Sequence, residues 1–426
     1  PVLWALVLPE EYEAAKQYCF GGEEEKYAKL IAKTGLNVKK GQTVFIAAGL
    51  DQPAFVAMVV EECYKAGASE VYVEWSYQPV EKLSSQYRTL ESLSNLKPWV
   101  KAKWEFKSEN YSCRLFIESE DPDGMNGVDQ EKMSAARRAL FPQIKPFRLA
   151  MENRHQWCIA AVPGVAWSKK VFPQLSEKKA VEAMWQAILQ ASRADGKNPV
   201  QAWKEHNQDL SNRCAYLNGL GLQYLEYKSA NGTNLLVQLN EDGLFAGGQE
   251  KTLKGRSFNP NIPTEEVFTS PKAGAAEGIV YSTKPLSYMG ELIENFSMRF
   301  EKGRAVEVHA EKGEELLKKM ISMDEGAARL GECALIPFNS PISQSGILFY
   351  NTLFDENASC HLAVGHGFNE CLKGYENYTD EECKKRGINE SMIHVDFMIG
   401  AADMSVVGIT KTGERVQIFQ NGNWAF

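Results

Sequence analysis

An alternation of strand-like and helix-like segments near the start of the chain constrains its fold most. Residues 43–48 (Thr-Val-Phe-Ile-Ala-Ala) form an apolar run that predicts a buried strand. The segment 55–63 carries apolar residues at helical spacing and ends at Gly67, and residues 71–73 (Val-Tyr-Val) predict a second strand. Such a β-α-β unit crosses over right-handedly, so we expect parallel strands. Because no GxGxxG motif follows the first strand, nucleotide binding is disfavoured.

The same alternation continues through the first half of the chain. Residues 112–118 and 157–162 predict further strands, with a helix over 130–140 between them. A helical segment over 178–217, broken by Gly-Lys-Asn-Pro, contains Trp185 and Trp203. An indole buries a large apolar area, so we expect both to pack in the core rather than to contact a ligand.

The character of the sequence changes near residue 218. Five short strand-like segments follow, separated by turn signals such as Asn-Gly and Lys-Gly, at 224–227, 235–239, 278–282, 296–300 and 305–309. One helix, over 313–323, interrupts them. The 426 residues therefore predict two domains. Residues 1–218 are expected to form an α/β domain with a largely parallel sheet, and 219–426 an α+β domain with a mainly antiparallel, barrel-like sheet.

Charge and cysteine content narrow the possible partners. With 47 Lys and Arg against 55 Asp and Glu, the net charge is -8, which offers no broad basic face for a nucleic acid. The nine cysteines form no CxxC pair and are expected to be reduced thiols of a cytoplasmic protein. The apolar segment 1–9 lacks a basic flank and is too short to span a bilayer, so no membrane partner is expected.

Acidic residues and histidines gather in the second half. The stretch 354–361 (Phe-Asp-Glu-Asn-Ala-Ser-Cys-His) contains Glu356 and His361, and His394 and Asp396 follow. Carboxylate oxygen and neutral imidazole nitrogen both coordinate a borderline cation such as Zn²⁺. His394 and Asp396 are two residues apart, so on a strand they share a face. Alone they would be read as a hydrogen-bonded core pair; beside Glu356 and His361 they favour a metal site.

Further carboxylates lie among apolar residues. Glu265 and Glu266 are adjacent, so we expect one to face inward and the other to be solvated, and Glu332 falls within an apolar run. An isolated buried carboxylate is costly without a cation or a donor. Arg329 is the alternative partner for Glu332. A metal site shared with the histidines is the more economical interpretation.

Long strings surround these residues and recur near the start of the chain. They are PTEEVFTSP from Pro263, DEGAARLGE from Asp324, SPIS from Ser340, FYNTLFDENASCHLA from Phe349, HVDFMIG from His394, IFQNGNWA from Ile418, GLNVKKGQTV from Gly35 and KAGASEVYVEW from Lys65. Together they resemble the metallopeptidase family of thermophilic aminopeptidase T and aminopeptidase S over nearly the whole chain. The resemblance implies an α/β N-terminal domain, a metal site in the C-terminal domain and assembly as a homodimer.

The resemblance also implies two divalent metal ions. The family's ligands fall on Glu266, Glu332, His361, His394 and Asp396, and all five are retained. Zn²⁺ and Co²⁺ both suit such a mixed nitrogen and oxygen site, so the ligands do not choose between them.

The residues beside these ligands leave catalytic roles open. Glu356 is either a further ligand or the general base. Family members generally have a tyrosine seven residues after the first ligand histidine, thought to help at the transition state, and this chain has Phe368 there. The nearby His366 is a candidate replacement donor, although a surface-loop histidine is the simpler interpretation.

The sequence thus predicts a metal-dependent aminopeptidase that releases the N-terminal residue of short peptides through an activated water. Two alternatives stay open. One is a homologue that is weakened or inactive and only binds peptides. The other is a two-metal phosphoesterase, although no Arg or Lys cluster adjoins the ligands to receive a phosphate.

Overall fold

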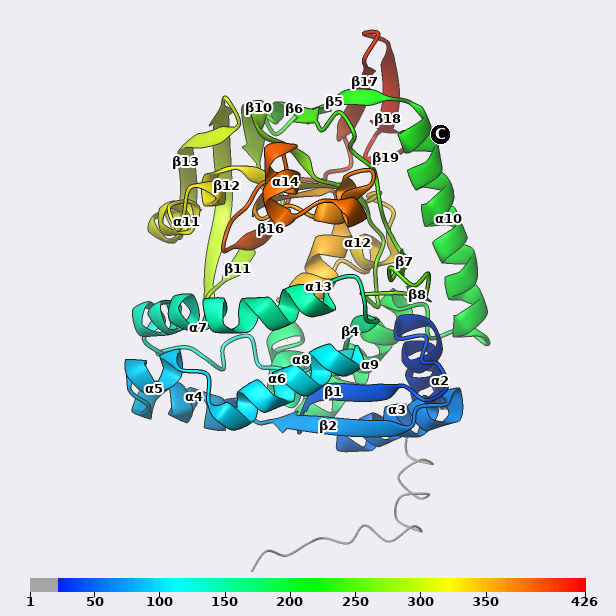
Figure 1. Ribbon diagram of the computed structural model, residues 1–426. Coiled ribbons are helices and arrows are strands. Elements are labelled where there is room, and N and C mark those ends of the chain that lie inside the picture. Colours follow the sequence, from blue (N-terminus) through cyan, green and yellow to red (C-terminus); the bar gives the residue numbers. More distant parts are fainter. Residues whose placement is uncertain (1–21) are drawn as a thin grey trace, which may run out of the picture. The chain divides into compact units, whose positions relative to one another are not determined.

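The computed structural model describes residues 22–426, so the expectation about the apolar segment 1–9 lies outside the described residues. The chain divides into two compact units (Figure 1). Of the described residues, the first comprises 22–205 and Gln249–Pro263, and the second His206–Gly248 and Thr264–Phe426. The predicted boundary at residue 218 falls inside a helix and stays a prediction.

The first unit contains the predicted parallel sheet. Its order is β2-β1-β3-β4, and all three pairings are parallel. The strands are β1 (Thr43–Gly49), β2 (Glu70–Ser76), β3 (Cys113–Glu118) and β4 (Trp157–Ala161). A two-stranded ribbon, β7 (Glu250–Lys251) with β8 (Ser257–Phe258), belongs to the same unit. The β-α-β prediction is therefore confirmed.

Helices flank this sheet (Figure 1). They are α2 (Glu23–Leu30), the π-helix Ile31–Gly35, α3 (Pro53–Ala66), α4 (Gln78–Tyr87), α5 (Leu90–Ser94), α6 (Pro98–Asn110), α7 (Gln130–Met151), α8 (Val165–Val171), α9 (Glu177–Ala191) and α10 (Pro199–Gly219), the last continuing into the second unit. Helix α3 ends at Gly67 as predicted, because φ there is 108°, a left-handed value that glycine adopts most readily.

Two details of these helices bear on the sequence predictions. Helix α7 begins as predicted, since the Asp129 side chain accepts a hydrogen bond from the N–H of Lys132, but it continues through two prolines to Met151. Its contacts with α5 and α6 outweigh the local preference to stop. Trp185 and Trp203 are buried, and Nε1 of Trp203 donates to the carbonyl of Ser192 at 2.7 Å. Their predicted core role is confirmed.

The second unit is built from antiparallel strands, as predicted. Its larger sheet has the order β11-β12-β10-β6-β5-β17-β18-β19, with β13 paired to β12. These strands are β5 (Leu222–Lys228), β6 (Asn234–Leu239), β10 (Pro271–Tyr281), β11 (Leu286–Tyr288), β12 (Glu291–Glu301), β13 (Arg304–Lys312), β17 (Ser405–Thr410), β18 (Arg415–Gln420) and β19 (Asn423–Trp424).

A smaller antiparallel sheet of order β16-β15-β14-β9 holds the candidate ligands. Its strands are β9 (Val267–Thr269), β14 (Leu330–Leu335), β15 (His361–Gly365) and β16 (His394–Met398). The helices of this unit are α11 (Glu314–Ile321), α12 (Pro341–Ser345), α13 (Thr352–Asp355) and α14 (Asp380–Lys385), with 3-10 turns at Gly326–Ala328, Glu356–Ala358, Asn369–Cys371 and Tyr375–Asn377.

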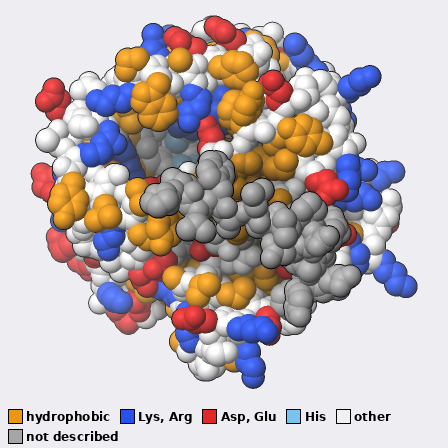
Figure 2. All heavy atoms as spheres, turned by 90° about the horizontal axis from the view of Figure 1, so that it is seen from below, with side chains coloured by type: hydrophobic (Ala, Val, Ile, Leu, Met, Phe, Trp, Pro, Cys, Tyr) orange, Lys and Arg blue, Asp and Glu red, His pale blue; other side chains and the backbone are white. Residues whose placement is uncertain are grey.

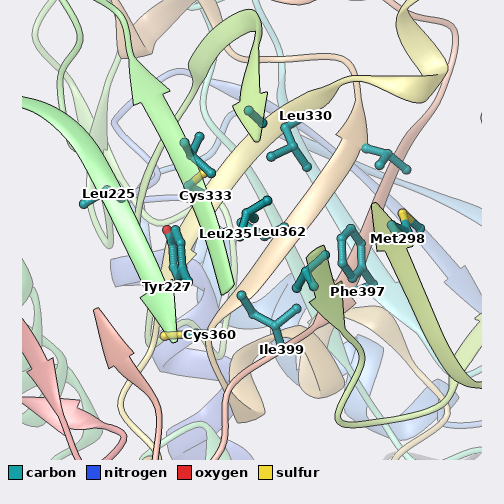
Figure 3. Packing of buried hydrophobic residues seen from close by; sticks show 14 of the residues in the cluster. Leu225, Tyr227, Leu235, Met298, Leu330, Cys333, Cys360, Leu362, Phe397 and Ile399 are labelled. Atoms are coloured by element: carbon teal, nitrogen blue, oxygen red, sulfur yellow. The ribbon is translucent and has the colours of Figure 1, made fainter. Parts of the chain in front are cut away.

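One face of the smaller sheet packs into the hydrophobic core. Cys333, Leu362 and Phe397 lie in one cross-strand row, because Cys333 pairs with Leu362 and Leu362 with Phe397. All three are buried in the same cluster, as are Tyr227 and Ile399 (Figure 3). Successive side chains of a strand point to opposite faces, so the residues next to these three along the chain point the other way. Those neighbours include Glu332, His361 and Asp396.

Three further observations concern the surface, the helices and the cysteines. Figure 2 shows basic and acidic side chains intermixed on the face that it presents, with apolar groups between them. Within residues 22–426, no helix combines the length and apolarity that a bilayer crossing needs. All eight cysteines of this part of the chain are free, and seven of them are buried.

Candidate metal centre

The five predicted ligands come together in the second unit. Glu332 lies on β14, His361 on β15, and His394 and Asp396 on β16, while Glu266 directly precedes β9. Two groups of three have ligand atoms that all lie within 4.8 Å of one another. One is Glu266, Glu332 and His361, and the other is Glu332, His394 and Asp396. Because Glu332 belongs to both, the arrangement suits two neighbouring cations that share one carboxylate.

Short distances link the two groups. Nε2 of His361 lies 3.6 Å from Oε2 of Glu266 and 3.9 Å from Oδ1 of Asp396. Nε2 of His394 lies 3.1 Å from Oε2 of Glu332 and 3.2 Å from the same Oδ1 of Asp396. Both imidazoles thus direct Nε2 toward the carboxylates. Side chains that coordinate the same metal ion must converge in this way.

Strand register keeps space open between these ligands. Glu332 pairs with Ala363, and Ala363 pairs with Asp396, so the three lie in one cross-strand row. The same register places Gly365 opposite His394. A methyl group or a hydrogen therefore stands where a larger side chain would reach in among the carboxylates. The row leaves room for cations because its middle residue is alanine.

Backbone carbonyls fix the orientation of both imidazoles. Nδ1 of His361 lies 2.9 Å from the carbonyl oxygen of Glu356, and Nδ1 of His394 lies 2.7 Å from that of His366. A carbonyl only accepts, so each Nδ1 must carry the hydrogen and each neutral imidazole must keep its lone pair on Nε2. This is the usual outer support of a metal-binding histidine.

The chemistry of the donor set fits divalent cations. Oδ1 of Asp396 is buried and accepts no hydrogen bond of good geometry, although two imidazole nitrogens lie within 4 Å of it. A buried carboxylate oxygen without a donor is costly. A cation placed among these atoms would satisfy it together with both Nε2 lone pairs.

Electrostatics in the cluster lead to the same conclusion. Burial, and then the negative charges of Asp396, Glu266 and Glu332, raise the pKa of Glu356 well above its usual range. Burial alone would favour the neutral form of His394, but Asp396 and Glu332 raise its pKa well above the ordinary value. Bound cations would offset this repulsion between buried carboxylates.

The structure corrects one expectation about the adjacent glutamates. We expected one of Glu265 and Glu266 to be solvated, and this is wrong, because their exposures are only 5% and 9%. The segment precedes β9, so the alternation of a regular strand does not apply to it. The N–H of Glu265 donates to Oδ1 of Asn357 at 2.7 Å, and its carboxylate lies 3.9 Å from Nε2 of His206.

The alternative partner of Glu332 is engaged elsewhere. The guanidinium of Arg329 pairs with Glu325 at 2.8 Å. Glu332 is 4% exposed and faces His394 instead.

Asn357 is a supporting residue that the sequence analysis did not identify. It is fully buried, and it also donates from Nδ2 to the carbonyl of Leu353 at 3.0 Å. It therefore ties the segment of Glu266 to the turn of Glu356. The only sequence signal was an amide inside the acidic string, and ligand chemistry by itself does not single it out.

Comparison with known proteins places the chain in a family. A model of the family described as thermophilic metalloprotease (M29) matches residues 22–424. Aminopeptidase AmpS of Bacillus subtilis (strain 168) is 41% identical over 408 residues, which are 96% of this chain and 99% of that protein. Aminopeptidase PepS of Streptococcus thermophilus is 42% identical over 402 residues, or 94% and 97%.

The chain belongs to the M29 metalloprotease family. The solved structure of wild-type AmpT from Thermus thermophilus is similar, with a TM-score of 0.88 and 39% identity over 96% of this chain and 100% of that one. The predicted family and fold class are confirmed, as is the enzyme class, a metalloaminopeptidase.

Within this M29 protein, the position of Phe368 adjoins the cluster. Its ring centroid lies 4.9 Å from that of His394, tilted by 48°, and 5.5 Å from that of Phe268 in an edge-to-face contact. Its N–H donates to Oγ of Ser270 at 2.7 Å. The position is thus beside a candidate ligand, and the phenyl ring offers that ligand packing but no hydroxyl.

His366 contributes to the cluster differently from the sequence expectation. Its side chain is exposed in the loop after β15, in agreement with the surface-loop interpretation. Its backbone carbonyl is what reaches the cluster, as the acceptor for Nδ1 of His394.

The row through Ala363 yields a prediction about metal content. Ala363→Leu would fill the space between Glu332 and Asp396, so we expect the folded variant to lose most of its bound metal. Ala363→Gly leaves the space open and is the matched control. Elemental analysis measures the metal, and circular dichroism checks the fold. Full metal content in Ala363→Leu would show that the row does not adjoin the cations.

Metal affinity is expected to fall as the pH is lowered. The carboxylates raise the pKa of His394, so in the metal-free protein the imidazole stays protonated at pH values where a histidine is ordinarily neutral. A histidine that binds a metal must be neutral. Each displaced proton weakens binding by roughly tenfold for every pH unit below that pKa. Calorimetric titration with Zn²⁺ at pH 6 and pH 8 measures this, and a pH-independent affinity would contradict it.

Proposed function

We propose that this metalloaminopeptidase releases the N-terminal residue of short peptides with two divalent ions, Zn²⁺ or Co²⁺. The supporting observation is the pair of three-residue groups that share Glu332. When bound, two such ions supply Lewis acidity and lower the pKa of the attacking water. Glu266 and His361 would hold one ion, His394 and Asp396 the other, and Glu332 both.

Glu356 is the residue we assign to proton transfer. Burial, and then the negative charges of Asp396, Glu266 and Glu332, raise its pKa. Glu356 therefore interacts electrostatically with all three carboxylates. A carboxylate there can take a proton from the attacking water and pass it to the leaving amine. Its side chain adjoins the cluster while its carbonyl orients His361, so the same residue serves the reaction and the ligand set.

Phe368 limits the rate in this proposal. A hydroxyl that donates to the developing oxyanion is worth on the order of 10²–10³ in turnover. The phenyl ring packs against His394 and donates nothing. We therefore favour slow catalysis over a pure peptide-binding role, since a binder has little need of a complete two-metal ligand set.

Two further features belong to the proposal. Assembly as a homodimer follows from the family resemblance, and light scattering tests it. A reducing, cytoplasmic location suits the free cysteines of residues 22–426. The net charge of -8 and the intermixed surface charges disfavour a nucleic-acid partner.

One assay separates the proposed function from its rivals. The protein is stripped with a chelator, reloaded with Zn²⁺ or Co²⁺, and given an aminoacyl chromogenic amide, its N-acetylated form and a phosphate monoester. We expect hydrolysis of the free-amine substrate alone, and only after reloading, which should also raise the melting temperature by mass action. Equal rates on blocked and free substrates would indicate an endopeptidase or amidase. Phosphate release would indicate a phosphoesterase.

Replacing Glu356 tests its role in proton transfer. Glu356→Gln keeps the shape and removes the basic carboxylate, so turnover should drop by about 10²–10⁴ with unchanged metal content. Glu315→Gln on the exposed face of α11, where the side chain is 81% exposed, is the matched control. Loss of an ion from the Glu356 variant would reassign it as a ligand.

Restoring the hydroxyl tests the role of Phe368. Phe368→Tyr should raise turnover by roughly 10²–10³ at constant metal content, because the added group lies beside the His394 imidazole. His366→Ala keeps the carbonyl that orients His394 and should leave activity intact. No gain in the tyrosine variant together with a collapse in His366→Ala would make the exposed imidazole the donor. Absence of hydrolysis in both would indicate a peptide binder.

A further inference from the structure

The carbonyl that orients His394 belongs to a loop that one buried asparagine holds in place. Asn389 is 2% exposed and lies between α14 and β16. Its Nδ2 donates to the carbonyl of Gly365, and its own backbone carbonyl accepts from the N–H of Gly367 at 2.8 Å. Asn389 therefore binds the chain on both sides of His366. The reaction proposed above assigns it no role.

Peptide geometry transmits this contact to the candidate ligand. The carbonyl of His366 and the N–H of Gly367 belong to one peptide group, and in a trans peptide these two groups point in opposite directions. Because the N–H points toward the carbonyl of Asn389, the carbonyl of His366 must point away from Asn389. It points toward Nδ1 of His394, 2.7 Å distant. The direction of the acceptor for His394 is thus set by Asn389.

The preceding peptide group is held in the same way. Its carbonyl, on Gly365, accepts from Nδ2 of Asn389, and its N–H, on His366, donates to the carbonyl of Ile393 at 2.7 Å. The same Nδ2 also donates to the carbonyl of Gly326 at 2.9 Å. A side-chain amide has two N–H protons, so both of them are used here. Two consecutive peptide groups of the loop therefore depend on one residue.

A carboxylate farther from the candidate ligands holds the segment 389–393. Asp324 accepts from the N–H of Met392 at 2.6 Å, and Oγ of Ser391 lies 2.9 and 3.0 Å from its two carboxylate oxygens. Oγ of Ser391 in turn accepts from the N–H of Ile393 at 3.2 Å. The segment is therefore fixed directly before β16 begins.

We propose that Asn389 is a positioning residue for His394 and sets the affinity of the cation that His394 and Asp396 would hold. The inference rests on the proposed two-ion function and adds a residue outside the ligand set. The acceptor for Nδ1 of His361 is the carbonyl of Glu356, which does not belong to this loop. Binding of the second cation, beside His361, should therefore not depend on Asn389.

Replacing the amide by an apolar group tests the assignment. Asn389→Leu keeps the branching at Cγ, adds no charge and removes both donors. Asn218→Leu is the matched control, because Nδ2 of Asn218 also donates to a backbone carbonyl of the second unit, that of Phe245 at 3.0 Å. Each full-length protein is stripped with a chelator, its melting temperature is measured, and Zn²⁺ is added in a calorimetric titration.

The unaltered protein is expected to bind Zn²⁺ in two steps. In Asn389→Leu one step should weaken by about 10–100-fold, as is typical when the outer support of a ligand is removed, and the other should keep its affinity. Asn218→Leu should keep both steps. Ser391→Ala, which removes only the link between Asp324 and Ile393, should weaken the same step by a smaller factor.

Proton NMR of the Co²⁺-loaded proteins provides a readout that a general loss of stability would not change. Each ligand imidazole carries a proton on Nδ1, and a carbonyl that accepts this proton slows its exchange with water. In Asn389→Leu one of the two Nδ1–H signals, that of His394, should exchange faster. The signal of His361 should be unchanged, and the control should keep both.

The outcomes separate the inference from the function on which it rests. Binding of fewer than two ions by the unaltered protein would overturn the two-ion proposal and the inference with it. Two unchanged steps in folded Asn389→Leu, or equal weakening of both, would overturn the role of Asn389 and leave the aminopeptidase function standing. If Asn389→Leu does not fold, Ser391→Ala decides, and unchanged binding and exchange in that variant would overturn the inference.

Discussion

Mutual repulsion among buried carboxylates is the constraint on which the second unit depends. Glu266, Glu332 and Asp396 converge near Glu356, and burial together with their negative charges raises the pKa of Glu356 well above its usual range. Two imidazoles alone offset only part of that charge. The sheet can hold these groups together because its other face, with Cys333, Leu362 and Phe397, packs into the main core. Apolar burial on one face thus stabilises a charge cluster on the other that cations complete.

Small residues and backbone carbonyls complete the arrangement. Ala363 and Gly365 keep the space opposite the ligands clear, and the carbonyls of Glu356 and His366 direct both Nε2 atoms inward. Close approach of the chain is also needed behind the cluster, where a Cβ at Gly331 would come within 2.2 Å of the His366 carbonyl oxygen. The geometry of the candidate ligands therefore depends on the small size of Ala363, Gly365 and Gly331 as well as on the ligands themselves.

We propose that phenylalanine in place of the family's tyrosine at position 368 lowers the reaction rate without weakening metal binding. The phenyl ring retains the packing against His394 and Phe268, so the ligand set keeps its support. In the proposed mechanism, the missing hydroxyl would donate where negative charge develops during hydrolysis.

The sequence alone predicted the change from an α/β to a largely antiparallel part and the strand and helix periods, because periodicity is a local property, and it supplied the donor chemistry of the five candidate ligands. The His394 and Asp396 spacing predicted a shared face by the same local rule. Tertiary structure alone decided that Glu265 is buried with Asn357 and His206, that Ala363 separates two ligands and that a carbonyl, not an imidazole, links His366 to the cluster. These depend on strand register and on the path of an irregular segment, which bring together residues distant in the chain. No local pattern encodes such distances, because they result from the packing of several strands at once.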